Sequence, residues 1–270
     1  MIVTRFAPSP TGLLHLGHAY AALTAHMAGE RFLLRIEDID TQRCREDFVT
    51  AIYEDLGWLG LTWERPVLRQ STRFDAYRAA LSQLADLTYP CFCTRADIAA
   101  AASAPHGPEG ALYPGTCRDL HRTPKPGETY ALRLDAVKAA ARVGPLFFEE
   151  AGKGRVAVDP LLFGDIVLAR KDTPSAYHLA VVVDDAHQGV TLVTRGEDLF
   201  LATHVQLLLQ ALLGLPAPRY AHHQLILGED GRKFSKRDQS VTLRSLREAG
   251  ATPQQIGEWV GLAIHSSPPR

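Results

Sequence analysis

The chain has 270 residues, of which 46% are hydrophobic and 22% are charged, and its formal net charge is −1. This composition is typical of a globular protein with one large domain or two smaller ones. The balanced charge excludes a global attraction to nucleic acid, so RNA binding would require local clusters of basic residues. The sequence has no run of about 18 apolar residues and no apolar signal core. We therefore expect no membrane span, a cytoplasmic location, and cysteines that are thiols or metal ligands.

The N-terminal segment predicts the start of a βαβ unit. Met1–Phe6 and Arg31–Ile36 are short apolar runs that predict strands, the second of them buried. Between them, apolar residues recur at helical spacing from Leu16, and the helix is expected to stop near Gly29. Strand, helix and strand in this order favour a parallel sheet. The predicted apolar face of the helix consists of Leu16, Tyr20, Leu23 and Met27.

The middle of the chain predicts further helices and a sheet that is interrupted by an insertion. Apolar spacing predicts helices over residues 74–84 and 201–212. Residues 89–154 are rich in proline and glycine and hold most of the cysteines, which indicates an inserted module. Two β-branched runs, at residues 179–183 and 190–194, predict that the sheet resumes afterwards.

The C-terminal part predicts a capped helix. Thr252, Pro253 and Gln255 combine an N-cap, a first-turn proline and a capping-box partner. The apolar face that follows is expected to consist of Ile256, Trp259, Val260 and Ala263.

The segment Arg5–His18, RFAPSPTGLLHLGH, joins the first predicted strand to the first predicted helix. Its prolines stiffen the turn, and Gly12 permits a backbone conformation that other residues resist. His15 and His18 lie three positions apart and therefore share one face of the first helical turn. Gly17 leaves room for a flat ring, and the N–H groups of a helix N-terminus suit a phosphate. For a histidine pair considered alone, a stiff turn with two surface histidines is the alternative.

A second motif, GEDGRKFSKR at residues 228–237, places Lys233 and Lys236 in a glycine-containing loop. Lysines on such a loop can close over a polyphosphate and stabilise charge in the transition state. Considered alone, the segment would usually be a solvated basic loop. The GKG at residues 152–154 imitates a dinucleotide fingerprint but lacks a convincing following helix, and no Walker-type loop occurs. The histidine and lysine motifs together therefore favour an ATP site.

These motifs resemble the two signature sequences of class I aminoacyl-tRNA synthetases. HLGH at residues 15–18 resembles the "HIGH" motif, and KFSKR at residues 233–237 resembles the "KMSKS" motif. The matches run in order from residue 3 to about residue 240, so they cover most of the chain. Other segments resemble the glutamyl branch of the family; they are residues 5–12, 35–40, 177–178, 182–185 and 195–198.

The resemblance implies an α/β fold with a Rossmann-type parallel-sheet catalytic domain, an inserted zinc-binding module and a short helical C-terminal region. The catalytic domain is expected at residues 1–88 and 155–225. The inserted module with its zinc site is expected at residues 89–154, and the lysine loop and helical C-terminal region at residues 226–270.

The resemblance also implies glutamate and ATP with Mg²⁺ as ligands, and the residue chemistry agrees. Arginine forks suit carboxylates, a tyrosine hydroxyl can add a hydrogen bond, and an acidic residue at a strand end can hold an ammonium group. Singly, each arginine would be a surface ion pair and the acid a solvated loop residue. The expected glutamate-binding residues are Arg5, Ala7, Ser9, Glu37, Tyr177 and Arg195. The expected ATP-binding residues are His15, Gly17, His18, Lys233, Ser235 and Lys236, of which His15, His18 and Lys236 are the expected catalytic residues.

Three cysteines of the inserted module indicate a structural zinc site, because three thiolates and one further ligand are a normal set for zinc. The C-x-C spacing is tight, and three ordinary thiols are the alternative. His106 or His121 would be the conventional fourth ligand, whereas the resemblance favours Tyr113. Cys44 stands apart and is expected to be an ordinary helix residue. The expected zinc ligands are Cys91, Cys93, Tyr113 and Cys117.

Only a short segment follows the lysine motif, too short for the anticodon-binding region of a full glutamyl-tRNA synthetase. The chain thus resembles the short paralogues of that enzyme. This implies tRNA-independent activation of glutamate and its transfer to the queuosine base at the wobble position of tRNA(Asp). A glutamyl-tRNA synthetase fragment that charges a tRNA 3′ end and a catalytically silent RNA-binding relative are the alternatives.

We expect a monomer whose zinc module and C-terminal helices meet tRNA(Asp) carrying queuosine. A local basic cluster could contact phosphates, and a solvated helix face is the alternative interpretation of it. The cluster consists of Lys233, Arg237, Arg244 and Arg247.

Overall fold

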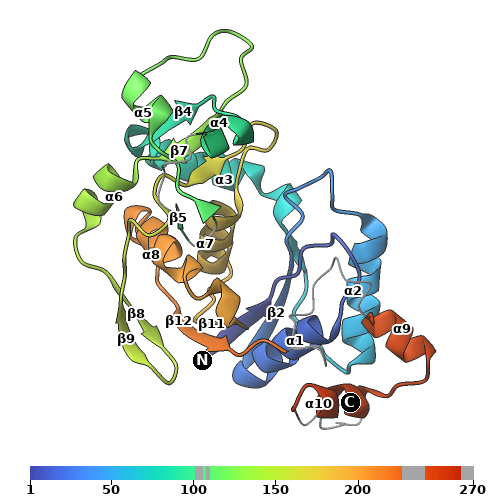
Figure 1. The fold of residues 1–270 in the computed structure, drawn as a ribbon. Helices are drawn as coiled ribbons and strands as arrows, with labels where there is room; N and C mark the ends of the chain where they lie inside the picture. The colour runs from blue at the N-terminus through green and yellow to red at the C-terminus, as the bar shows by residue number, and fades with distance from the viewer. Residues whose placement is uncertain (101–105, 108–109, 227–240, 263–270) are drawn as a thin grey trace. The chain divides into compact units, whose positions relative to one another are not determined.

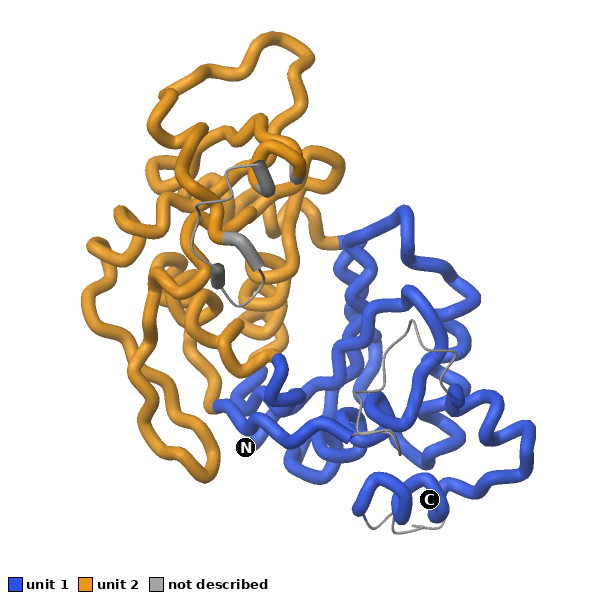
Figure 2. The backbone as a smooth tube through the Cα atoms, in the orientation of Figure 1, with its two compact units in different colours: residues 1–72, 190–198, 220–270 blue, residues 73–189, 199–219 orange. Residues whose placement is uncertain are grey.

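The computed structural model describes residues 1–100, 106–107, 110–226 and 241–262 (Figure 1). The chain divides into two compact units, each made from separate chain segments (Figure 2). The first unit comprises residues 1–72, 190–198 and 220–270, and the second comprises residues 73–189 and 199–219. The expected domain boundaries at residues 89 and 155 both fall inside the second unit, and the three-part division of the sequence stays a prediction.

The first unit contains the predicted βαβ start of a parallel sheet. Strands β1, β2 and β3 lie in that order, and both neighbouring pairs are parallel. Helix α1 connects β1 to β2 and packs against β1. The elements of this unit are β1 (Val3–Phe6), α1 (Leu16–Ala28), β2 (Arg31–Ile36), α2 (Glu46–Trp58), β3 (Leu68–Arg69), β11 (Leu192–Gly196), β12 (Arg219–His223, whose first residue belongs to the second unit), α9 (Leu243–Glu248) and α10 (Pro253–Trp259).

Helix α1 ends where the sequence predicts, and the structure gives the physical reason. The Thr4 hydroxyl donates to the Ala25 carbonyl at 2.7 Å, which holds the end of the helix close to β1. A Cβ atom on Gly29 would lie 2.3 Å from the Thr4 hydroxyl oxygen, so no side chain fits at this turn. The predicted apolar face is partly wrong, because Met27 is 57% exposed and small residues form much of the buried face. The buried residues of α1 are Ala19, Ala22, Leu23 and Ala25.

The C-terminal helices are part of the core of the first unit. Leu243 in α9 and Ile256 in α10 are fully buried in the same apolar cluster as α1 and β2. The predicted capping box is confirmed, since the Thr252 hydroxyl accepts from the Gln255 N–H and the Gln255 side chain accepts from the Thr252 N–H. Trp259 is 50% exposed and was wrongly assigned to the apolar face. Ala263 lies outside the described residues.

The second unit combines an antiparallel sheet with packed helices. The sheet has the order β10–β7–β4, and β8 and β9 form a separate antiparallel hairpin. Helices α3 and α8 both pack against α7. The elements are α3 (Phe74–Gln83), β4 (Thr88–Cys91), α4 (Arg95–Ala100), β5 (His106–Gly107), β6 (Gly110–Ala111), α5 (Thr116–Leu120), β7 (Ala131–Leu134), α6 (Ala136–Val143), β8 (Phe147–Glu150), β9 (Gly154–Ala157), β10 (Val167–Ala169), α7 (Tyr177–His187) and α8 (Ala202–Leu212).

One strand prediction is wrong. Residues 179–183 lie in α7, whereas the run at 190–194 leads into β11 as predicted. A helix that is buried on most of its surface shows no amphipathic period, so its apolar run resembles a buried strand. Asp184 then ties α7 to α3, because Tyr77 donates to its carboxylate at 2.7 Å and Arg73 at 2.6 Å.

The glycine pair at residues 152–154 belongs to the turn of the β8–β9 hairpin. Gly152 and Gly154 have φ angles of 76° and 72°, which a side chain would disfavour. No helix follows the segment directly, because the chain continues into strand β9, as the sequence analysis predicted when it rejected a dinucleotide-binding loop. Among the helices of the described residues, none is both long enough and apolar enough to span a membrane.

Candidate functional site

The two histidines of HLGH build the N-terminus of α1. His15 is the N-cap residue, and its Nδ1 accepts from the Gly17 N–H at 3.1 Å. His18 Nδ1 accepts from the His15 N–H at 3.2 Å, so the two side chains form a capping box. Their rings lie close, with centroids 3.8 Å apart. The predicted pairing of the histidines on the first helical turn is confirmed.

This capping fixes the chemistry that the rings can offer. A neutral imidazole carries one proton, and both Nδ1 atoms act as acceptors here. The proton of each neutral ring therefore sits on Nε2, which can donate to an anionic oxygen. Gly17 suits this arrangement, because a Cβ there would lie 3.1 Å from His15 Cε1 and the ring would have to shift by a few tenths of an ångström.

Two of the expected glutamate-binding residues lie on adjacent segments of the first unit. Arg5 on β1 is 5% exposed, and its Nη1 donates to the Thr194 carbonyl at 3.3 Å. Arg195 follows Thr194 on β11, is 6% exposed, and donates from Nε to His222 Nε2 at 3.0 Å. The two guanidinium groups thus contact a backbone carbonyl and a histidine ring inside the unit rather than acidic side chains on the surface. The alternative of exposed surface ion pairs is wrong for both.

Glu37 lies immediately after β2, and it is buried. Its Oε1 accepts from Arg35 Nη2 at 3.0 Å, and its N–H donates to the Pro8 carbonyl at 3.0 Å. The second contact brings the turn with Ala7 and Ser9 next to Glu37. A solvated loop acid, the alternative for Glu37, is therefore wrong.

Asp38 stabilises the chain beside Glu37. Its carboxylate accepts from Arg69 Nε at 2.9 Å and from both the N–H and the hydroxyl of Ser71 at 2.8 Å. The sequence analysis predicted no role for Asp38. Its position beside Glu37, directly after a buried strand, could have indicated a functional residue, because sites form at the ends of parallel strands.

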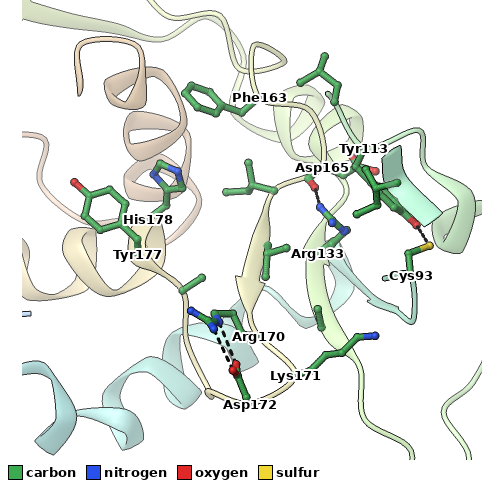
Figure 3. A pocket seen from close by; sticks show the side chains of 16 residues that line it. Cys93, Tyr113, Arg133, Phe163, Asp165, Arg170, Lys171, Asp172, Tyr177 and His178 are labelled. Carbon is green, nitrogen blue, oxygen red and sulfur yellow. Dashed lines mark hydrogen bonds and ion pairs between the residues drawn. The ribbon is translucent and has the colours of Figure 1, made fainter. Parts of the chain in front are cut away.

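Tyr177 belongs to the second unit, at the first position of α7. The structure thus brings together Arg5, Ala7, Ser9, Glu37 and Arg195 in the first unit and holds Tyr177 in the other. Tyr177 lines a cavity of about 620 Å³ that lies wholly within its own unit (Figure 3). The predicted ATP-binding residues Lys233, Ser235 and Lys236 lie outside the described residues.

Three cysteines and a tyrosine of the second unit come together as expected for a metal site. The sulfurs of Cys91, Cys93 and Cys117 all lie within 4.8 Å of one another, and all are thiols. The Tyr113 hydroxyl lies 3.4 Å from Cys93 Sγ, a contact visible in Figure 3. Among the described residues, these three cysteines form the cluster of side chains that could hold a metal ion, and His121 is not part of it. The His106 side chain is not described.

The dimensions and the acidity of this cluster suit a soft cation. Cys93 Sγ and Cys117 Sγ are 3.5 Å apart, which is compatible with Zn–S bonds of about 2.3 Å in a tetrahedral site. Burial opposes ionisation of Cys117, but hydrogen bonds from Tyr113 and the Phe92 N–H lower its pKa to about 7. Burial raises the pKa of Cys93 to about 11. A bound cation would favour the thiolate form of both.

Replacing Cys117 with serine is expected to remove bound metal and to lower the melting temperature by about 5 °C or more, since a structural metal contributes directly to folding stability. Metal analysis and thermal unfolding of the purified variant measure both effects. Cys44→Ser is the matched control, because Cys44 belongs to the first unit and is not a member of the cluster. Cys44 lies before α2, so the prediction that it is a helix residue is wrong. Unchanged metal content in Cys117→Ser would contradict the metal site.

Two members of the expected basic cluster are engaged inside the first unit. Arg244 pairs with Glu54 at 3.2 Å, and Arg247 approaches both Glu54 and Asp55 at 3.6 Å. These contacts dock α9 on α2. The alternative interpretation, in which these two arginines belong to a solvated helix face, is therefore wrong in that both form ion pairs with α2. Lys233 and Arg237 lie outside the described residues.

Asp55 carries a consequence for stability. Burial raises its pKa to about 6, although Arg247 and Arg244 act in the opposite direction. A carboxyl whose pKa is higher in the folded state than in the unfolded state stabilises the fold below its unfolded pKa, and that contribution is lost as the pH rises to about 6. Asp55→Asn should therefore unfold with a larger free energy than the wild type at pH 7 and a similar one near pH 4. Urea titrations at both pH values test this, and an equal difference at the two values would contradict it.

The family assignment follows from comparison with known proteins. The family model described as tRNA synthetases class I (E and Q), catalytic domain, matches residues 1–266. The chain therefore belongs to the family of class I tRNA synthetase catalytic domains. The parallel sheet of the first unit and the helices around it agree with the α/β fold of this class.

Three relatives show which members of the family the chain is similar to. A Rhodobacter capsulatus protein named glutamyl-Q tRNA(Asp) synthetase is 50% identical over 97% of this chain and 100% of its own length. A Nocardia farcinica protein of the same name is 46% identical over 98% of this chain and 86% of its own length. A glutamate–tRNA ligase of Aquifex aeolicus is 39% identical over 99% of this chain but only 58% of its own length.

A solved structure supports the fold. The glutamate tRNA ligase of Elizabethkingia meningosepticum, in complex with its amino acid, superposes with a TM-score of 0.70 at 30% identity. The alignment covers 88% of this chain and 52% of that ligase. The chain thus spans about half the length of this solved relative.

Proposed function

We propose that the protein activates L-glutamate with ATP in the absence of tRNA and transfers it to the queuosine base at the wobble position of tRNA(Asp). The relatives named for this activity are more similar to the chain than the glutamate–tRNA ligases with which it was compared. Because its substrates are ATP and tRNA, we place the reaction in the cytoplasm. A monomer suffices for the residues that the proposal uses.

The observation that carries the proposal is the return of the chain to the histidine pair after the lysine motif. Thr242 forms an antiparallel bridge with His15, and the Leu243 N–H donates to the Leu14 carbonyl at 2.8 Å. Lys236 is six residues before Thr242, so covalent geometry limits the distance between their Cα atoms to about 20 Å. A lysine side chain and an ATP molecule can together cover much of that distance, which supports a shared site for the two motifs.

The first step is the attack of the glutamate α-carboxylate on the α-phosphorus of ATP. A bond from carboxylate oxygen to phosphorus forms, the bond to the bridging oxygen breaks, and pyrophosphate leaves. No general base is required, because the carboxylate is already ionised. His15 and His18 donate to phosphate oxygens through Nε2, and Lys236 stabilises the charge that develops. Mg²⁺ accompanies ATP and neutralises part of its charge.

Glutamate recognition requires partners for two carboxylates and one ammonium group. Arg5 and Arg195 supply guanidinium donors, and Tyr177 supplies a hydroxyl. Glu37 has one oxygen held by Arg35, and its carboxylate provides the negative charge for the ammonium group. Each charge-assisted hydrogen bond contributes about 1.5–3 kcal/mol.

The second step transfers the glutamyl group. A hydroxyl oxygen of the acceptor attacks the carbonyl carbon of the adenylate, an ester bond forms, and AMP leaves with its electron pair. The hydroxyl proton passes to solvent. Cys91, Cys93, Tyr113 and Cys117 would hold one zinc ion, which stabilises the fold of the inserted module and takes no part in the two steps.

One experiment separates this proposal from its alternatives. Labelled glutamate and ATP are incubated with tRNA(Asp) that does or does not contain queuosine, and with tRNA(Glu). Label confined to queuosine-containing tRNA supports the proposal. Label at the 3′ end of tRNA(Glu) would instead identify a charging enzyme, and a failure to form any adenylate would indicate a silent RNA-binding relative.

A further inference from the structure

The cavity beside Tyr177 is larger than glutamate needs. Its volume of about 620 Å³ lies in the range of about 300–1,000 Å³ that is typical of sites for whole small molecules. In the proposed reaction the acceptor hydroxyl has to come within about 3–3.5 Å of the adenylate carbonyl carbon. If Tyr177 contacts the glutamyl group, the acceptor must therefore bind in the space that adjoins Tyr177.

The walls of the cavity have the chemistry of a nucleoside site. Tyr177, His178 and Phe163 form one aromatic wall, with ring centroids 5.2 Å apart for the first two and 5.7 Å for the last two (Figure 3). Opposite them, the Arg133 guanidinium lies 4.0 Å from the centroid of the Tyr113 ring. Aromatic and guanidinium planes are the surfaces on which proteins stack unpaired bases.

Asp165 also lines the cavity, but its carboxylate is engaged by the fold. It accepts from the Tyr89 hydroxyl at 2.6 Å, from Arg118 Nη1 at 3.0 Å and from the Ala136 N–H at 2.9 Å. Its role is to join β4, α5 and α6, and little of its hydrogen-bonding capacity remains for a ligand.

The exposed part of the lining carries a different acid. Arg170 and Asp172 lie in the turn between β10 and α7 and form a two-pronged pair, with both nitrogen–oxygen distances 3.0 Å. Their side chains are 40% and 42% exposed. The Thr173 hydroxyl donates to the same carboxylate at 3.3 Å. Arg170 lowers the pKa of Asp172, so the carboxylate stays ionised at neutral pH.

A vicinal diol is complementary to such a pair. Each hydroxyl is both a donor and an acceptor, a carboxylate only accepts and a guanidinium only donates. Two adjacent hydroxyls can therefore donate to Asp172 while their oxygens accept from Arg170.

We propose that this cavity binds the acceptor nucleoside, with its base against the aromatic wall and its vicinal diol on the Arg170–Asp172 pair. This inference rests on the proposed function, which it deepens by naming the acceptor site. Queuosine carries such a diol on its cyclopentene ring, and the terminal ribose of any tRNA carries one as well. The chemistry of recognition is shared, so the experiment must distinguish the two sources.

The test compares Asp172→Asn and Arg170→Met with a matched pair of controls. Asp86 and Arg142 also form a two-pronged, exposed pair in the second unit, but they do not line the cavity. Asp172→Asn and Arg170→Met should raise the KM for queuosine-containing tRNA(Asp) about tenfold or more, since each removes a charge-assisted bond. Glutamate-dependent pyrophosphate exchange should stay within about twofold. Asp86→Asn and Arg142→Met should change neither quantity.

A binding measurement identifies the diol. The wild-type protein should bind tRNA(Asp) with queuosine more tightly than the same tRNA with guanosine, and Asp172→Asn should lose this preference. Equal affinities in the wild type, with a loss of binding to both tRNAs in the variant, would assign the pair to the terminal ribose and overturn the queuosine assignment. Unchanged KM and binding in both variants would overturn the site. The proposed function itself fails by a separate result, namely a wild-type protein that transfers no glutamate to queuosine.

Discussion

Replacing Lys236 with alanine is expected to slow glutamate-dependent pyrophosphate exchange by about 10²–10³-fold, the usual cost of removing one preorganised charge from a transition state. Glutamate binding should persist, because the residues proposed for its recognition lie in other segments. The exchange rate at saturating substrates and equilibrium binding of labelled glutamate are the two measurements. A lower rate with unchanged binding separates catalysis from recognition.

Lys153 provides the matched control for this substitution. It lies in the turn of the β8–β9 hairpin, and its ammonium group lies 4.1 Å from the centroid of the Phe200 ring. Lys153→Ala removes the same charge from a residue that has no proposed role in the reaction, so its exchange rate should equal that of the wild type. Full exchange activity in Lys236→Ala would remove the assigned role of Lys236 and weaken the case for a shared site with His15.

Short motifs with local geometry were the predictable part of this molecule. HLGH was identifiable because a stiff turn, a helix start and two histidines at i and i+3 are all encoded within a few neighbouring residues. The Thr252 capping box was identifiable for the same reason. The first βαβ segment followed from apolar runs that differ clearly in period.

The features that failed depend on tertiary structure. The run at 179–183 is helical because α3 and α8 pack against α7 and bury nearly all of its surface, and a sequence pattern does not reveal this. The ion pairs of Arg244 and Arg247 were not predictable because their partners, Glu54 and Asp55, are distant in the sequence. Contact between this cluster and phosphates stays a prediction.

The cavity illustrates the same limit. Its lining comes from several elements between Cys93 and His178, and no periodic signal marks Arg170 or Asp172. Only the folded chain places this pair on the same cavity as Tyr177. The sequence motifs therefore indicated the residues proposed for activation more readily than the residues proposed for the acceptor.

Replacing His15 with asparagine is expected to preserve α1 while reducing glutamate activation about 10²-fold or more. Asparagine is among the preferred N-cap residues, so its side-chain oxygen can accept from the Gly17 N–H as His15 Nδ1 does. It has no second donor that reaches as far as an imidazole Nε2. The melting temperature and the pyrophosphate exchange rate measure the two roles separately.

Alanine at the same position makes the distinction quantitative. His15→Ala loses both the cap and the Nε2 donor, so it should be about 1 kcal/mol less stable than His15→Asn. The two variants should be equally poor in exchange, because both lack the donor to the phosphate. Activity that instead followed stability across the two variants would mean that His15 acts only by holding the helix N-terminus in place. Equal loss of activity at different stabilities would require direct contact between this ring and the reacting phosphate.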